Sequence, residues 1–312
     1  MTGRGIDLAP SLPGPDPTLE TRPVPQERQN PVRSFGPGAS HNIQETARPL
    51  EELEQEIEES GFKDDTSDDG DTEIKYLLEL LTSECHIDWR GDASDTQDPT
   101  WGPSLVVTAY SEKAQRNLDR AISNLTETAH RYFLRFTGSQ SKLFAREAFN
   151  RLSFDVIENR ELLENASDDR VREEFNAHVR SLRLYPADLR FDKLRAKRLN
   201  DGLNRPSGPR RFDVCIVLDE AAVEELAALR FLDNLEGDGN TLRDISVKMV
   251  ERDWSYPEEA DSEQSYGFGQ QKKYYTGVDM CPIYDLPFVC GKLYEHAGLG
   301  EMFPLFMCRD NH

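Results

Sequence analysis

The chain has 312 residues, with 58 Asp or Glu against 37 Lys or Arg and a net charge of −21 at pH 7. A charge of this sign and size argues against a general nucleic-acid binder, because repulsion from phosphate would oppose each encounter. No apolar run approaches the length of a membrane span and the first residues lack an apolar signal core, so we expect a non-secreted, cytoplasmic or nuclear protein without membrane contact.

Residues 1–103 are predicted to be disordered, first proline-rich and then acidic. Nine of the eighteen prolines lie in the first fifty residues, and such a segment buries too little apolar surface to offset the entropy of ordering its backbone. Residues 51–98 carry eighteen acidic residues against three basic ones, a local charge of −15. Two short helices are expected within this region, near 48–60 and 73–84.

The remainder, 104–312, is predicted to be one α+β domain in which helices cover a mixed sheet. An alternative organisation has two halves, 104–189 and 211–312, joined by a basic linker at 190–210. The pattern of apolar residues predicts these elements: strand 104–110, helices 111–136 and 140–152, strand 153–157, helix 168–185, a strand and helix within 211–240, strands 244–254 and 272–281, and a helix over 282–298.

The string CIVLDEAA places Asp219 and Glu220 directly after an apolar strand. Nucleotide hydrolysis would need such acids opposite a phosphate-binding loop, and the chain has no G-x-x-x-x-G-K-[ST]. We therefore interpret Asp219 as a helix cap. The alternative is an enzyme of unrecognised type, in which Asp219, Glu220 and His296 perform acid–base chemistry at the ends of strands 104–110 and 212–218.

A nominal iron-binding pattern lacks the structural context that metal sites have. The H-x-D of His86 and Asp88 has the spacing of an iron(II) site, but it lies in a Pro- and Asp-rich segment with no strand around it. The histidines that would complete it are His130, His178 or His296. We predict no metal there and no cofactor.

Five cysteines at uneven spacing indicate reduced thiols in a cytoplasmic or nuclear protein. Cys281, Cys290, His296 and Cys308 could nominally bind zinc, but they lack the closely spaced Cys pair of structural zinc sites. We predict that Cys281 and Cys290 pack as small apolar side chains.

Two segments are candidates for contact with a partner. Leu77, Leu78 and Leu81 fit L-x-x-L-L, a pattern typical of a short helix that docks in a partner's groove or, more commonly, on the protein's own core. The stretch 190–211 has a charge of +6 and could contact phosphate, nucleic acid or the acidic residues 51–98. Its candidate binding residues are Arg195, Lys197, Arg198, Arg210 and Arg211.

The strings RFDVCIVLDEAAVEEL (211–226) and VDMCPIYDLPFVCGKLYEHAG (278–298) resemble uncharacterised, lineage-restricted proteins of filamentous fungi. The resemblance covers about residues 100–312 and rests on hydrophobic pattern. It implies no activity and no site residues, because none is known for that group. Our expectation is therefore a non-catalytic protein whose acidic residues 51–98 contact a protein partner or the chain's own basic stretch.

Overall fold

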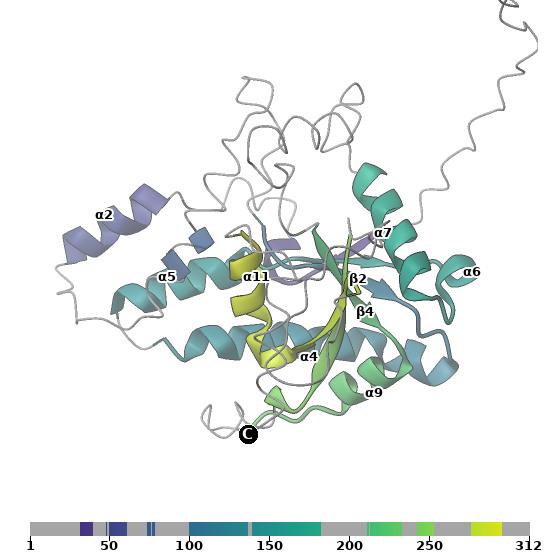
Figure 1. Cartoon of the computed structure of the whole chain (residues 1–312). Helices are drawn as coiled ribbons and strands as arrows, with labels where there is room; N and C mark the ends of the chain where they lie inside the picture. The colour runs from purple at the N-terminus through teal and green to yellow at the C-terminus, as the bar shows by residue number, and fades with distance from the viewer. Residues whose placement is uncertain are drawn as a thin grey trace, which may run out of the picture.

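The computed structural model describes a folded core together with parts of the segments that lead into it. The described residues are 32–39, 48, 50–60, 74–75, 77–78, 100–136, 139–181, 211, 213–232, 242–252 and 276–294. They form a six-stranded sheet with helices on both faces (Figure 1). This confirms the α+β class and the mixed sheet covered by helices.

The sheet has the strand order β1-β3-β2-β4-β5-β6. Its three central strands, β3, β2 and β4, are parallel, and β1, β5 and β6 join antiparallel at the two sides. Short apolar and β-branched runs form the centre, where both faces are covered. The strands are β1 (Arg33–Phe35), β2 (Ser104–Val107), β3 (Phe154–Ile157), β4 (Val214–Leu218), β5 (Ser246–Glu251) and β6 (Val278–Pro282).

The helices lie in two layers because the chain crosses the sheet in opposite directions. It passes from β2 to β3, then returns past β2 to β4, and right-handed crossovers in opposite directions place their helices on opposite faces. Figure 1 shows α4 and α9 on one face and α6 and α7 on the other. The helices are η1 (Pro37–Ala39), α2 (Leu50–Ser60), α4 (Glu112–Leu134), α5 (Ser139–Asn150), α6 (Arg160–Leu163), α7 (Asp168–Ser181), α9 (Glu220–Ala228), η3 (Ile283–Asp285) and α11 (Leu286–Tyr294).

Helix α4 forms where the sequence has its most regular apolar period. Residues at three- and four-residue spacing, such as Leu118, Ile122 and Leu125, are buried against the sheet. The helix begins after Ser111, whose hydroxyl oxygen accepts a hydrogen bond from the backbone N–H of Ala114 at 3.1 Å. The predicted cap and the predicted helix are both confirmed.

The segment around β1 differs from the expectation for residues 1–103. β1 pairs with β3, and Phe35 packs against the core. Gly36 has φ +108°, and the backbone N–H of Gly38 donates to the carbonyl oxygen of Leu152 at 2.8 Å. The sequence predicts disorder here because three strand residues among prolines carry no periodic signal, whereas backbone pairing with β3 orders them.

Two described parts of the acidic stretch also pack on the domain. Leu53 and Ile57 of α2 are buried, as are Ile74, Leu77 and Leu78. Leu77 and Leu78 therefore lie in the protein's own core, and Leu81 lies outside the described residues. The sequence predicts the helix near 48–60 correctly, and residues 74–75 and 77–78 are helical within 73–84.

Candidate functional site

The carboxyl edge of the parallel strands is the place where proteins of this layout usually bind ligands. β2 leads to α4 on one face and β3 leads to α6 on the other, so a crevice is expected between these strand ends. Tyr110 is buried at this position, and its hydroxyl oxygen accepts a hydrogen bond from the backbone N–H of Asn159 at 2.7 Å. Burial raises the pKa of Tyr110 to about 12, so the phenol stays neutral. The side chain thus bridges the two strand ends.

The candidate acids Asp219 and Glu220 follow β4 on the other side of β2. The carboxylate of Asp219 accepts a hydrogen bond from the backbone N–H of Ala222 at 2.9 Å and caps α9, as the sequence predicts. The carboxylate of Glu220 accepts from the backbone N–H and the hydroxyl of Ser111, at 3.0 and 2.7 Å. These hydrogen bonds lower the pKa of Glu220.

Glu220 therefore holds a negative charge beside the first turns of α4 and α9. Helix amino termini favour anions there, because their N–H groups and dipoles point outward. In this fold the protein's own carboxylate takes that position. The geometry gives Asp219 and Glu220 capping roles and weakens the acid–base interpretation of these strand ends. His296, its third member, lies outside the described residues.

The histidines of the iron hypothesis are not brought together. His130 on α4 stacks on Phe149 with ring centres 4.5 Å apart, and its Nδ1 lies 3.3 Å from a Glu127 carboxylate oxygen. His178 is buried on α7, which covers the opposite face. His86 and Asp88 fall outside the described ranges. Within those ranges, no three His, Cys, Asp or Glu side chains form a group that could hold a metal ion.

Cys281 and Cys290 pack as the sequence predicts. Cys281 on β6 and Cys290 on α11 are buried in the apolar core, as is Cys215 on β4. Burial raises the pKa of Cys290 to about 12 and also raises that of Cys215, so these thiols stay protonated. Cys308 is not among the described residues.

Arg211 does not belong to a surface patch, in contrast to the expectation for this residue of the basic stretch. Its side chain is only 3% exposed, and its guanidinium donates to Asp155 at 2.9 Å, to the carbonyl oxygen of Ser153 at 3.1 Å and to the hydroxyl of Thr100. Arg211 lies just before β4, and the start of this central strand is inside the fold. A run of basic residues in the sequence does not reveal that its last member is buried. Arg195, Lys197, Arg198 and Arg210 lie outside the described residues.

His178 is a titratable group close to this ion pair. Burial lowers the pKa of its imidazole, while the negative charge of Asp155 raises it and the positive charge of Arg211 lowers it. The buried imidazole is therefore held in its neutral form. Its place on the buried side of α7 indicates a part in packing the helix on the sheet.

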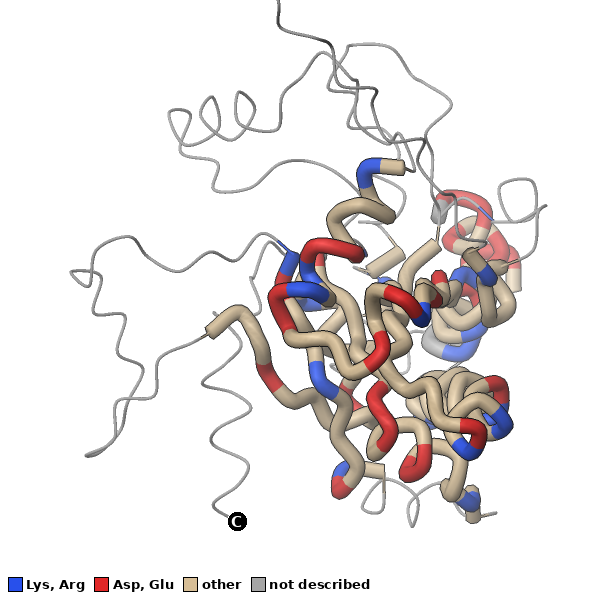
Figure 2. Tube along the Cα trace, turned by 90° about the vertical axis from the view of Figure 1, so that its right-hand side faces the viewer, with Lys and Arg blue, Asp and Glu red and all other residues tan. Residues whose placement is uncertain are grey.

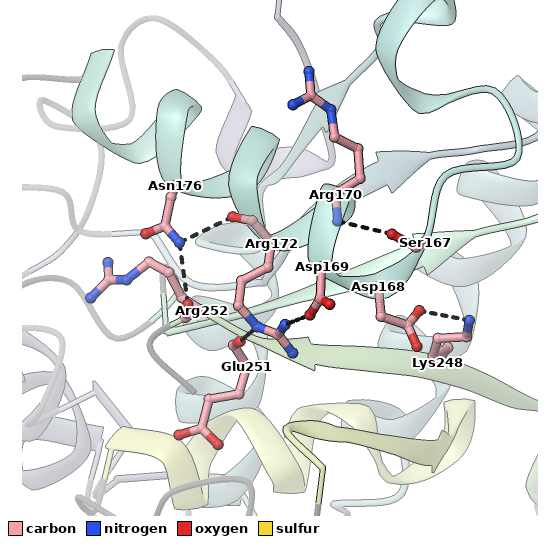
Figure 3. A network of polar contacts seen from close by, with 9 residues as sticks. All are labelled: Ser167, Asp168, Asp169, Arg170, Arg172, Asn176, Lys248, Glu251 and Arg252. Carbon is pink, nitrogen blue, oxygen red and sulfur yellow. Dashed lines mark hydrogen bonds and ion pairs between the residues drawn. The ribbon is translucent and has the colours of Figure 1, made fainter. Parts of the chain in front are cut away.

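A polar network joins α7 to β5 (Figure 3). Arg172 donates to the carbonyl oxygen of Glu251 at 2.8 Å and to the carboxylate of Asp169 at 2.6 Å. Lys248 on β5 donates to Asp168, in the first turn of α7, at 2.9 Å. These contacts link two secondary-structure elements, so we assign the network to the stability of the fold.

Helix α2 carries the densest set of surface carboxylates in the described chain, and acidic positions follow one another around its turns (Figure 2). Leu53 and Ile57 face the core, and the exposed acids point away from it. We call the exposed acids the acidic face of α2: Glu51, Glu52, Glu56, Glu58 and Glu59.

A buried ion pair fixes the start of this helix. Glu147 on α5 and Arg151, the residue after this helix, lie 2.8 Å apart between their charged groups and are almost fully buried. Glu147 also accepts a hydrogen bond from the backbone N–H of Arg48 at 2.9 Å, and Arg151 donates to the carbonyl oxygen of Arg48. Sequence reasoning missed these anchors, although the i, i+4 spacing of Glu147 and Arg151 in a predicted helix was a visible signal.

Fold and contacts together define an α+β protein whose acidic amino-terminal helix is fastened to the domain. No family model, no curated protein and no solved structure matches the chain. No helix within the described ranges is long and apolar enough to cross a membrane.

Proposed function

We propose that this protein is a non-catalytic interaction protein and that the acidic face of α2 binds a basic segment of a partner protein. The observation that carries the proposal is the orientation of α2. Its apolar residues Leu53 and Ile57 are buried in the protein's own core, and its carboxylates are left exposed on one fixed helix. The helix is thus oriented for contact through charge.

The attachment of α2 favours binding because the surface is formed in advance. The ion pair between Glu147 and Arg151 holds the backbone of Arg48, and Lys75 holds Glu54 at 2.7 Å. A partner would not have to order the helix, so less of the contact energy is lost to conformational entropy. Fixed carboxylates also attract a basic segment over a distance, and salt weakens this attraction.

The chain's own basic stretch 190–211 is the alternative occupant. Arg211, at its end, is already paired with Asp155 inside the fold, which removes one of its charges from any contact with α2. Arg195, Lys197 and Arg198 stay candidates for such a self-contact. The same experiment can separate a partner protein from this self-contact.

The test neutralises α2 without disturbing its anchors. A variant with Glu51→Gln, Glu52→Gln and Glu58→Gln keeps Glu54 and Glu56, which pair with Lys75 and Arg48. The matched control carries Glu112→Gln, Glu161→Gln and Glu225→Gln, exposed acids on other helices with the same change in charge. Both variants and the wild type are purified with bound proteins after chemical cross-linking in cells.

We expect proteins with Lys- or Arg-rich segments to be recovered with the wild type and the control, and to fall about tenfold with the α2 variant and at high salt. Equal recovery with the α2 variant would show the proposal to be wrong. Zero-length cross-links from α2 to Lys193 or Lys197 of the same chain, with no partner recovered, would show that the chain's own basic stretch occupies the acidic face.

A further inference from the structure

A second surface, of opposite charge, lies at the carboxyl end of α4. Among the described residues there, three arginines lie over aromatic rings contributed by α4, η3 and the segment after α9. We call them the stacked arginines. Their guanidinium carbons lie 4.7 Å (Arg131 over Phe231), 3.8 Å (Arg135 over Tyr132) and 5.2 Å (Arg243 over Tyr284) from the ring centres.

Two of the three rings are in direct contact, and a hydrogen bond fastens the segment that carries the third. The ring centres of Tyr132 and Tyr284 are 5.9 Å apart, which joins the sites of Arg135 and Arg243. Arg131 donates to the carbonyl oxygen of Leu232 at 2.6 Å, which fastens the segment after α9 to α4. The three arginines therefore stand on a common packed base.

Stacking prepares an arginine for binding an anion. A guanidinium held over a ring loses rotational freedom but keeps N–H donors, which match the two oxygens of a carboxylate. The side chains of Arg135 and Arg243 are exposed, and each is held over a ring, so their N–H donors stay available to a ligand. The affinity for a carboxylate rises because less freedom remains to be lost on binding.

The surroundings combine positive charge with exposed apolar side chains. Arg230 adds a fourth cation. The acids near it in the described chain include Glu127, which pairs with Arg131 at 2.9 Å, the exposed Asp244 and the buried Asp285 beside Tyr284. Leu134 and Leu232 are 47% and 52% exposed, two of the most exposed large apolar side chains among the described residues. Exposed leucines beside oriented cations are typical of a protein contact rather than of a bare ion site.

We propose that this stacked-arginine surface binds a short segment of a partner protein in which acidic residues alternate with large apolar ones. Carboxylates would pair with Arg135 and Arg243, and apolar side chains would cover Leu134 and Leu232. The surface is independent of the acidic face of α2, because it has the opposite charge and lies on other elements.

Nucleic acid fits this surface less well, for two reasons. The rings of Tyr132 and Phe136 lie beneath Arg135 and are only 4% and 3% exposed, so they offer no stacking platform for bases. The chain's net charge of −21 also repels a polyanion over its whole length, whereas a short peptide carries few charges.

The experiment selects peptides from a random phage-displayed library on the full-length protein. The strongest peptide is then titrated by fluorescence anisotropy against the wild type and against Arg135→Gln with Arg243→Gln. Arg116→Gln with Arg120→Gln is the matched control, because these exposed arginines lie near the other end of α4. Arg135→Lys with Arg243→Lys keeps the charge and removes the planar donor. Arg131 is left unchanged because it anchors Leu232.

We expect selected peptides rich in Asp or Glu and in large apolar residues. Their binding should weaken about tenfold or more in the Arg135/Arg243 glutamine variant, weaken to a smaller degree in the lysine variant and stay unchanged in the control. Peptides without acidic residues, or equal affinity for wild type and glutamine variant, would overturn the proposal. Tighter binding of a labelled single-stranded oligonucleotide through the same arginines would overturn it in favour of nucleic acid.

Discussion

At the scale of single residues, charged side chains at the ends of the parallel strands hold the structure together. Glu220 joins the starts of two helices through Ser111, and Arg211 joins two strand starts through Asp155. Removing one partner of a buried pair such as Arg211 and Asp155 leaves an uncompensated charge, which typically costs about 3–5 kcal/mol. The same residue types suggest catalysis or a basic patch when only the sequence is considered.

The buried imidazole of His178 makes stability depend on pH. Its pKa in the folded state is lowered, so below its ordinary pKa of about 6.5 the unfolded chain binds a proton that the folded chain does not. The free energy of unfolding therefore decreases as the pH falls below that value. We expect His178→Gln to remove the part of this pH dependence that His178 contributes. The measurement is the urea-unfolding free energy of wild type and variant from about pH 7.5 to about pH 5. Parallel pH curves for the two proteins would contradict the assignment.

At the scale of elements, the amino-terminal segments are fastened by backbone contacts and a few buried side chains. β1 takes the outer side of β3, and a Cβ on Gly38 would lie 2.7 Å from the carbonyl oxygen of Arg151. That oxygen belongs to backbone and cannot move aside as a flexible side chain would. Close approach at Gly38 is therefore a requirement for docking η1, and it explains a glycine within a proline-containing segment.

Two glycine-to-alanine substitutions with opposite expected effects on stability test this docking. Gly38→Ala should destabilise the protein by about 1–3 kcal/mol, because the added carbon overlaps the backbone of Arg151 and Leu152. Gly291→Ala, inside α11 with no atom within 4 Å of the added carbon, should raise stability by about 0.5–1 kcal/mol through helix propensity. Urea unfolding of both variants measures the sign of each change in the free energy of unfolding. A neutral Gly38→Ala would mean that the segment does not depend on close approach.

At the scale of the whole molecule, the described chain has separate surfaces of opposite charge on one core. Segments before residue 104 contribute to that core through Phe35, Leu53, Leu78 and Trp101. Trp101 is fully buried and donates from its indole nitrogen to the carbonyl oxygen of Ala148 at 2.6 Å. The acidic region therefore cannot be removed at residue 104 without removing part of the fold, so charge-neutralising substitutions are the appropriate probe.

Two shortened chains measure this dependence. A chain that begins at Leu105 lacks β1, α2, Leu78 and Trp101, and we expect it to lose cooperative unfolding, because several large apolar side chains at about 2–5 kcal/mol each exceed the stability of a typical domain. A chain that begins at Pro31 keeps every described contact and serves as the control. Circular dichroism during urea titration distinguishes them. Cooperative unfolding of the shorter chain at the full-length midpoint would disprove the role of these segments.

Much of the framework follows from local pattern, because apolar periodicity and capping act over a few residues. The period of Leu118, Ile122 and Leu125 determines α4, and the apolar run 214–218 determines a central strand with Asp219 as a cap. The burial of Cys281 and Cys290 follows from similar runs. These features need no knowledge of which elements are neighbours.

Strand order, the pairing of β1 and the roles of charged residues were decided only by tertiary structure. Arg211 is buried because it pairs with Asp155 of β3, which lies beyond β2 from β4. Arg135 and Arg243 share one surface because Tyr132 packs on Tyr284. Contacts between residues far apart in the chain carry no local signal in the sequence. By itself, therefore, the sequence determined an acidic α+β protein and most of its elements. The fold determined which charges hold it together and which remain exposed.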